Sequence, residues 1–312
     1  MLPDDLSIIF GMKPEAAIAY AKSKGFAITW NWQEMLDDAH QRAFTVAKVV
    51  RLDVLQDIKD ALLSAKQEGK AFKQFADELT PILQSKGWWG KKVVVGGDGG
   101  AEVVQEGSLQ RLRTIFQTNM QSAYMAARMQ EMQDSTATHP YWEYVAVMDG
   151  RTRPSHRAMN GRVLLATDPF WITGFPPNGF NCRCRVKPLS RSAVRRSGVD
   201  VESSAGKLKT ITVESGVDKR TGEVLTAKRT GMKVVGESGK TVFFAPDAGF
   251  NAAPIGVGWI HDVLVVRAKR LLGERSANRL LKSRGIDATS GITDLSALAD
   301  YLSRAAAKQV GS

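Results

Sequence analysis

The sequence predicts an α+β fold in which helix-forming and strand-forming segments occupy separate stretches of the chain. Apolar residues recur at helical spacing through the first third of the chain and again over residues 108–133. Bulky residues alternate over 141–148, and short Val/Thr/Phe runs between 205 and 245 are split by glycine-containing turns. We therefore expect six segments, in this order: a helical N-terminal region (1–89), a Gly-rich loop (90–107), a compact central α+β domain (108–189), a basic linker (190–204), a small β-rich segment (205–258) and a helical C-terminal region (259–312).

The composition is typical of a folded soluble protein large enough for two or three compact units. Of its 312 residues, 43% are hydrophobic and 24% are charged. No apolar run approaches the ~20 residues that a membrane-spanning helix needs. The first residues, MLPDD, are acidic where a signal peptide would be basic, so we expect neither membrane insertion nor export.

The charge balance suits a polyanionic partner such as DNA. Forty-three Lys and Arg residues against 32 Asp and Glu residues give a net charge of +11 and a pI near 9.7. The excess is spread along the chain, which is also typical of an ordinary solvated surface. The chain has two cysteines, too few for a disulfide framework, and we expect a reducing compartment.

The N-terminal region is predicted to be a set of antiparallel helices or a bundle. PEAAIAYAKSKG begins with Pro at a first helical position and ends with Lys and Gly. Residues 31–68 have apolar residues at helical spacing and predict two helices, separate or continuous, that end at Gly69. Residues 70–90 predict one more helix, interrupted by Pro81.

The Gly-rich stretch 90–107 resembles a phosphate-binding loop only in composition. It lacks the spacing from glycine to Gly-Lys-Ser/Thr, so we favour a flexible loop or hairpin. The clearest single helix follows at 108–133, where Ser108 is a suitable N-cap. Its Met-rich and aromatic stripe is typical of core packing.

Strand patterns replace helical ones after Pro140. Residues 141–148 predict a strand that runs into a turn at Asp149-Gly150, and NCRCRV (181–186) predicts another. Antiparallel strands are expected within 205–245, with a hairpin at GESGK (236–240). The C-terminal region is expected to end in an amphipathic helix that begins near Asp294.

The stretch 149–186 contains a candidate zinc site. Cys182 and Cys184 are two residues apart, so in a strand both sulfurs project from one face and can reach one point. His156 supplies a third ligand of a type that zinc prefers. A fourth ligand could come from Asp149, Asp168 or His139.

Other interpretations of the same residues remain open. The spacing is not that of a Cys-x-x-Cys knuckle, and two buried thiols beside a hydrogen-bonded histidine explain the pattern equally well. A Cys-His-Asp149 triad activated by Arg183 and Arg185 is conceivable, but no nucleophile elbow or oxyanion glycine pattern accompanies it. A disulfide between the two cysteines would be strained.

The remaining residues of this stretch predict an ordered cluster of turns. Pro154 can open a short helix that Asn160-Gly161 closes, and FPPNGF (175–180) predicts a rigid corner followed by a turn. Phe170, Trp171 and Phe175 are expected to be buried against the strands.

MDGRTRPSHRAMNGRV, DPFW, FPPNGFNCRCRV and PDAGFNAAPIG together resemble the phage Mu F-like head morphogenesis family, the minor head proteins of tailed phages. The resemblance extends over about residues 12 to 256. The sequence departs from the family pattern at GFNAAPIG, which contains Asn251. The family motif falls on Asp149, Arg151, Thr152, His156, Gly161, Pro177, Asn178, Cys182, Arg183 and Cys184.

The resemblance implies a non-enzymatic, low-copy protein of the phage head, made in the host cytoplasm. Expected partners are the portal protein, the major capsid protein or a scaffold, with the helical N-terminal region as the contacting surface. Double-stranded DNA is a further expected partner, contacted without sequence specificity through Arg191, Arg195 and Arg196 or through Lys269, Arg270 and Arg275.

Two rival functions remain open from the sequence. One is a toxin-like or nuclease-type enzyme in residues 200–312, where His261 beside Asp262 is the only pair of that kind that we single out. The other is a free-standing, non-specific DNA-binding protein, whose affinity would fall steeply with salt.

Overall fold

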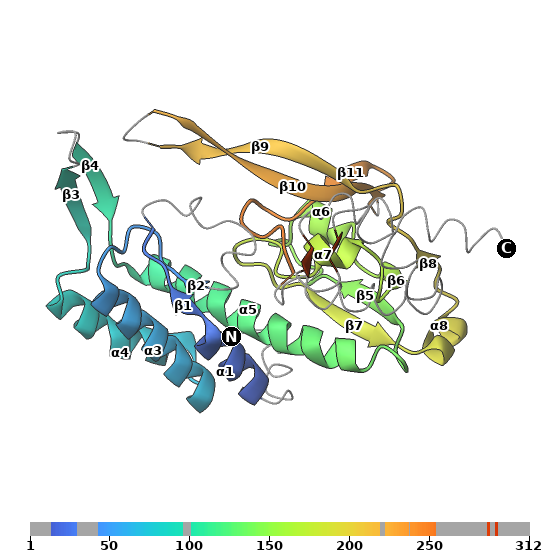
Figure 1. Cartoon of the computed structure of the whole chain (residues 1–312), viewed down its shortest axis with the longest axis horizontal. Coiled ribbons are helices and arrows are strands. Elements are labelled where there is room, and N and C mark those ends of the chain that lie inside the picture. Colours follow the sequence, from blue (N-terminus) through green and yellow to red (C-terminus); the bar gives the residue numbers. More distant parts are fainter. Residues whose placement is uncertain are drawn as a thin grey trace.

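The structure is a computed structural model, and it confirms the α+β class. A layer of helices lies at one end together with a two-stranded ribbon, and the four-stranded sheet lies toward the other end (Figure 1). The structure describes residues 14–29, 43–95, 101–218, 222–236 and 238–253, together with two short strands at 286–287 and 291–292.

The helical layer consists of α1 (Pro14–Ser23), α3 (Leu52–Glu68) and α4 (Phe72–Ser85), which pack against α5 (Leu109–Asp134). Two short parallel strands, β1 (Gly25–Phe26) and β2 (Ala43–Phe44), follow α1 and precede α3. A first hydrophobic core fills the space between these elements. The expected helix within 31–42 lies outside the described residues.

Helix α3 ends where the sequence predicts. Its buried stripe includes Leu55, Ile58 and Leu62, at the spacing of one helical face. Gly69 then adopts a left-handed conformation (φ 66°), and its N–H bonds to the carbonyl of Ala65.

Pro81 does not interrupt α4, and the predicted break is wrong. The helix continues from Phe72 to Ser85, with Pro81 on its exposed side. Phe75, Leu79 and Leu83 on the opposite side are buried in the first core. We attribute the continuity to this packing, which offsets the one backbone hydrogen bond that proline cannot make.

The Gly-rich stretch forms an antiparallel two-stranded ribbon, one of the two structures expected for it. Strand β3 (Lys91–Val95) pairs with β4 (Ala101–Gln105), and the ribbon projects from the end of the helical layer (Figure 1). The GGDGG tip (96–100) lies outside the described residues. At the base, Gly107 packs so closely on Trp89 that a Cβ there would lie 2.3 Å from the indole ring.

The central sheet has the order β7-β5-β6-β8. Strand β5 (Tyr141–Val145) pairs antiparallel with β6 (Val163–Leu165) and with β7 (Arg185–Leu189). Strand β8 (Val201–Glu202) adds to β6 in parallel. Two short helices, α6 (Pro154–Arg157) and α7 (Phe170–Gly174), lie in the connections.

The segment 190–204, expected to be a linker, has a defined structure instead. Ser190 caps the helix α8 (Arg191–Ser197), which buries Val194, and β8 follows in the central sheet. Arg162 holds Glu202 through two bonds of 2.5 and 2.7 Å. The Ser- and Arg-rich composition suggested a linker. The features that order the segment, one capping serine and one buried valine, do not stand out in such a composition.

A second sheet is formed by β9 (Lys209–Val217), β10 (Val224–Val235) and β11 (Thr241–Phe244), all antiparallel. The hairpin at 236–240 joins β10 to β11, with the Gly236 N–H bonded to the Lys240 carbonyl. Phe244, Met232 and Val234 bury the sheet against the central unit.

Part of the C-terminal region differs from the expected helix. Two short antiparallel strands, β12 (Ile286–Asp287) and β13 (Gly291–Ile292), lie within it. Ile286 is paired with Ile292 across these two strands. The pair His261 and Asp262, the basic residues Lys269, Arg270 and Arg275, and the expected helix from Asp294 lie outside the described residues.

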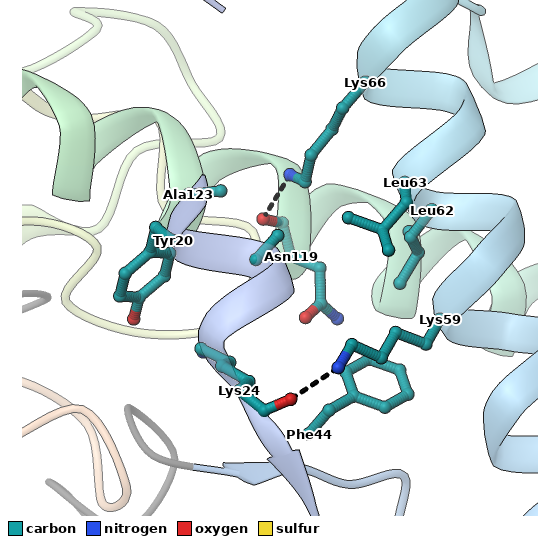
Figure 2. A pocket seen from close by; sticks show the side chains of 10 residues that line it. Tyr20, Lys24, Phe44, Lys59, Leu62, Leu63, Lys66, Asn119 and Ala123 are labelled. Carbon is teal, nitrogen blue, oxygen red and sulfur yellow. Dashed lines mark hydrogen bonds between the residues drawn. The ribbon is translucent and has the colours of Figure 1, made fainter. Parts of the chain in front are cut away.

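Lysines line a small cavity between α1, α3 and α5 (Figure 2). The Lys66 ammonium donates to the Asn119 carbonyl at 3.0 Å, and Lys59 donates to the Lys24 carbonyl. Burial lowers the pKa of Lys66 to about 7, with a further contribution from Lys24, and it lowers the pKa of Lys24 to about 8, with a further contribution from Lys59.

In the described part of the chain, no helix has the length and apolar character needed to cross a membrane.

Candidate functional site

The structure brings His156, Cys182 and Cys184 together inside the central unit. The Sγ atoms of Cys182 and Cys184 lie 3.8 and 3.5 Å from His156 Nδ1. All three ligand atoms lie within 4.8 Å of one another. The residues are buried, with exposed fractions of 2%, 6% and 1% for His156, Cys182 and Cys184.

Two short elements set this geometry. Pro154 opens the single turn of α6, which places His156 on the inner side with its ring against Phe244. The cysteines precede β7, which begins at Arg185, so the expected strand starts later than predicted. Both cysteines are buried and Arg183 between them is partly exposed, as the alternation predicted.

The three residues considered as a fourth ligand bind elsewhere. Asp149 holds Arg183, and Asp168 accepts bonds from the backbone N–H groups of Phe170 and Ser204. His139 pairs with Thr138 at 2.9 Å. Among the described residues, the cluster therefore contains one histidine and two cysteines.

Asp149 and Arg183 form a bidentate ion pair that joins the first turn to the cysteine segment. The two guanidinium nitrogens lie 2.6 and 2.7 Å from the carboxylate oxygens. These bonds from Arg183 hold the pKa of Asp149 well below its usual range.

The turn that carries Asp149 is braced from within. The Arg151 N–H donates to the Asp149 carboxylate at 3.0 Å, while the Arg151 side chain is largely exposed. The Thr152 hydroxyl donates to the Val147 carbonyl and lies 3.2 Å from the same carboxylate. These contacts give three motif residues a structural role in one turn.

Asn178 fixes the Pro-rich loop against the cluster. Its peptide follows a cis bond between Pro176 and Pro177, and its side chain is fully buried. The amide nitrogen donates to the Tyr144 hydroxyl at 3.1 Å and to the Gly174 carbonyl at 2.9 Å. The backbone N–H of Asn178 bonds to the Cys182 sulfur.

Gly161 closes the turn after α6, beside β5. It has a positive φ of 78°, and its N–H donates to the Tyr144 carbonyl at 2.9 Å. Asn160 accepts a bond from the Ala146 N–H at 3.0 Å. The turn predicted at Asn160-Gly161 therefore extends the hydrogen bonding of β5.

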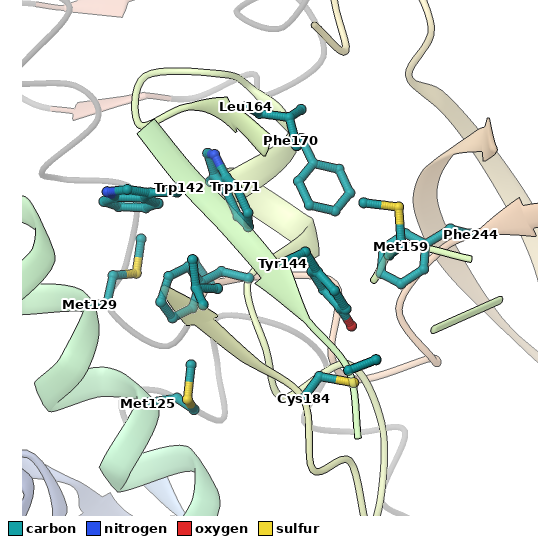
Figure 3. Close-up of a cluster of buried hydrophobic side chains, with 14 of the residues drawn as sticks. Met125, Met129, Trp142, Tyr144, Met159, Leu164, Phe170, Trp171, Cys184 and Phe244 are labelled. Atoms are coloured by element: carbon teal, nitrogen blue, oxygen red, sulfur yellow. The ribbon is translucent and has the colours of Figure 1, made fainter. Parts of the chain in front are cut away.

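Tyr144 is the residue of this site that the sequence analysis missed. Its hydroxyl bonds to Cys184, and Figure 3 shows it directed toward that sulfur. Burial, followed by the two nearby sulfurs, raises the pKa of Tyr144 well above its usual value. Period-two alternation over 141–145 could have placed Trp142 and Tyr144 on the buried face, although nothing in it pointed to the cysteines.

The pKa values of the two thiols are shifted in opposite directions because each thiol interacts with the other. A hydrogen bond from Cys184, with a further contribution from His156, lowers the pKa of Cys182. The neighbouring Cys182 sulfur and burial raise the pKa of Cys184. The arrangement offers soft donors to a metal ion, whereas the Cys-His-Asp149 triad is not assembled because Asp149 binds Arg183.

Comparison with known proteins places this site within a matched region. The family described as Phage Mu protein F like protein matches residues 56–187, from within α3 to within β7. The chain is 41% identical over 263 residues to the putative capsid assembly protein F of Escherichia phage Mu, across 84% of this chain and 59% of that protein. It is 41% identical over 236 residues to the Mu-like prophage FluMu F protein of Haemophilus influenzae, across 76% of this chain and 53% of that protein.

The chain thus spans about half the length of the curated relatives that it matches. No solved structure matches it.

We predict that Asp149→Asn lowers the thermal unfolding midpoint by a few degrees at pH 7. The Asp149 pKa is depressed in the folded state, so its stabilisation is present above the unfolded value of about 3.9 and is lost as pH falls below it. Unfolding curves between pH 7 and pH 2 should therefore converge for the variant and the original chain. Asp200→Asn, at an exposed carboxylate, is the control. A constant difference down to pH 2 would contradict the ion-pair account.

Proposed function

The chain belongs to the family of phage Mu protein F like proteins, and from this premise we propose that it is a head-assembly protein of a Mu-like phage or prophage. It acts through contacts with other head proteins and is not an enzyme. Its partners are the portal protein, the major capsid protein or a scaffold, and its location is the phage head.

One observation carries this proposal. The identity of 41% extends over 263 residues to a protein named for capsid assembly. The aligned length is about twice that of the 56–187 family match, so the likeness is not confined to one short motif.

The site geometry supports a role without turnover. The most chemically reactive groups of the central unit, the two thiols and His156, are 6% exposed or less. The surrounding motif residues are engaged in holding turns, as Asp149, Thr152 and Asn178 illustrate. Such burial favours a structural contribution over access by a substrate.

The β3–β4 ribbon is a surface suited to docking. Val93 and Val103 are cross-strand partners and are 66% and 62% exposed. An isolated two-stranded ribbon is only marginally stable in water, and its exposed edges can pair with another chain. A ribbon that projects from the body and carries an apolar pair fits a groove or sheet edge on another head protein.

Helix α8 is a surface suited to DNA. Arg191, Arg195 and Arg196 are exposed on a helix anchored by the burial of Val194. The net charge of +11 favours approach to a polyanion, and arginines arranged in this way bind phosphates without sequence specificity.

Mass spectrometry of purified particles tests the main proposal. We expect the chain in mature virions and in precursor heads at a fixed low copy number per particle. Deleting its gene should yield incomplete or unstable heads, and expression in trans should restore them. Mature particles that lack the polypeptide, with normal assembly after the deletion, would contradict the proposal.

A charge swap across the ribbon tests docking. Val93→Lys combined with Val103→Glu keeps a favourable cross-strand pair while removing apolar surface. Burial of a valine contributes about 1.5 kcal/mol or more, so incorporation into heads should fall by about tenfold or more. The unfolding midpoint of the free chain should change little.

The matched control for the ribbon is Val224→Lys combined with Val217→Glu. These valines are also exposed cross-strand partners, but they lie on β9 and β10. We expect this variant to enter heads normally. Equal incorporation of the two double variants would argue against the ribbon as the docking surface.

Salt-dependent binding of the free chain to duplex DNA tests the role of α8. Arg195→Gln combined with Arg196→Gln should reduce the slope of log affinity against log salt by about 2. Lys228→Gln combined with Lys233→Gln removes the same charge from exposed positions on β10 and should change the slope less. Equal slopes for the two variants would leave net charge, not α8, as the cause.

A further inference from the structure

We propose that His156, Cys182 and Cys184 form a structural zinc site that ties α6 to the segment before β7. The proposal rests on the geometry of these three side chains and is independent of the proposed function. Nothing in the role of a head-assembly protein requires such a site.

The spacing of the ligand atoms matches the spacing around one zinc ion. With Zn–S near 2.3 Å and Zn–N near 2.05 Å, a tetrahedral angle separates sulfur from nitrogen by about 3.6 Å, and a trigonal angle by about 3.8 Å. The Sγ–Nδ1 distances are 3.5 Å for Cys184 and 3.8 Å for Cys182. Small movements would therefore suffice for coordination.

Convergence on one nitrogen favours a metal over hydrogen bonding alone. Both sulfurs approach His156 Nδ1, which carries either one hydrogen or one in-plane lone pair, but not both. A single N–H cannot point along two directions, so one of the two contacts is poorly satisfied without an ion. A zinc ion at the common point would bind all three atoms.

Coordination would take both cysteines as thiolates, and the zinc ion would compensate their negative charge.

The Tyr144 hydroxyl adjoins the cluster, and the Asn178 side chain adjoins that hydroxyl. The Tyr144 hydroxyl bonds to Cys184, and it also accepts a bond from the Asn178 amide. The Oδ1 atom of Asn178 is buried and lacks a hydrogen-bond partner. A buried acceptor of this kind is costly, and a metal ion within reach of it would give it a partner.

The ion would act as a structural tie. His156 is held in a single-turn helix and the cysteines in an irregular segment, neither of which is stable by itself. Because the three ligands are almost completely buried, no open position faces solvent, which is characteristic of a structural zinc site and not of a catalytic one.

Metal analysis of the full chain tests the proposal. The chain is produced in zinc-supplemented medium and purified under reducing conditions without chelators. Mass spectrometry of the metal should give about one zinc per chain, and Cys182→Ser combined with Cys184→Ser should abolish it. The matched control is His139→Gln, because His139 lies outside the cluster and should leave the zinc content unchanged.

Cobalt substitution provides a test that does not depend on the folding of a variant. The original chain, reconstituted with Co²⁺, should show thiolate-to-cobalt charge transfer and the intense visible bands of a four-coordinate ion. Less than about 0.2 zinc per chain together with no such bands would overturn the proposal. Retention of zinc by the double serine variant would overturn it as well.

Discussion

A single helix is shared by the two hydrophobic cores, and the arrangement of the other elements depends on it. Leu112 and Ile115 in the N-terminal part of α5 belong to the core of the helical layer, while Met125, Met129 and Met132 belong to the core of the central unit (Figure 3). At 1.5 Å per residue, the 26 residues of α5 extend about 39 Å, which is long enough to serve both. The same helix covers one edge of the central sheet, because Gln121 and Arg128 donate to carbonyl groups of the cysteine segment and β7.

Hydrogen bonds within irregular backbone help to hold the central unit together. Its aromatic residues fill the core, with Trp142 and Trp171 at 5.5 Å between ring centroids and Tyr144 and Phe244 at 5.7 Å. Between these rings run turns whose polar groups would be costly if left unpaired. Asn178 and Asp168 are both buried and both bind backbone groups of neighbouring loops, so the packing and the hydrogen bonding each require the other.

The features that the sequence predicted are those with a local cause, and the others depended on tertiary contacts. The end of α3 at Gly69, the cap at Ser108 and the hairpin at 236–240 follow from the conformational preferences of a few adjacent residues. The proximity of His156 to the cysteines could be suggested from the sequence because cysteine and histidine are the residue types that bind zinc. The continuity of α4 through Pro81, the order of 190–204 and the burial of Lys66 could not, because each depends on a partner distant in sequence.

Side chains of residues 182–184 alternate between the core and the surface, so this short segment stabilises the neighbouring loops on both sides. Cys182 and Cys184 face inward to His156, whereas Arg183 faces outward to Asp149. Asp149 and His156 lie on the same connection between β5 and β6. The cysteine segment therefore contacts this connection both in the core and at the surface. A zinc ion on the inner side would reinforce a link that the ion pair already makes on the outer side. The density of polar and turn-forming residues over 149–186 is thus accounted for by stability, and within the described residues the ribbon and α8 are the surfaces that we propose for contacts with partners.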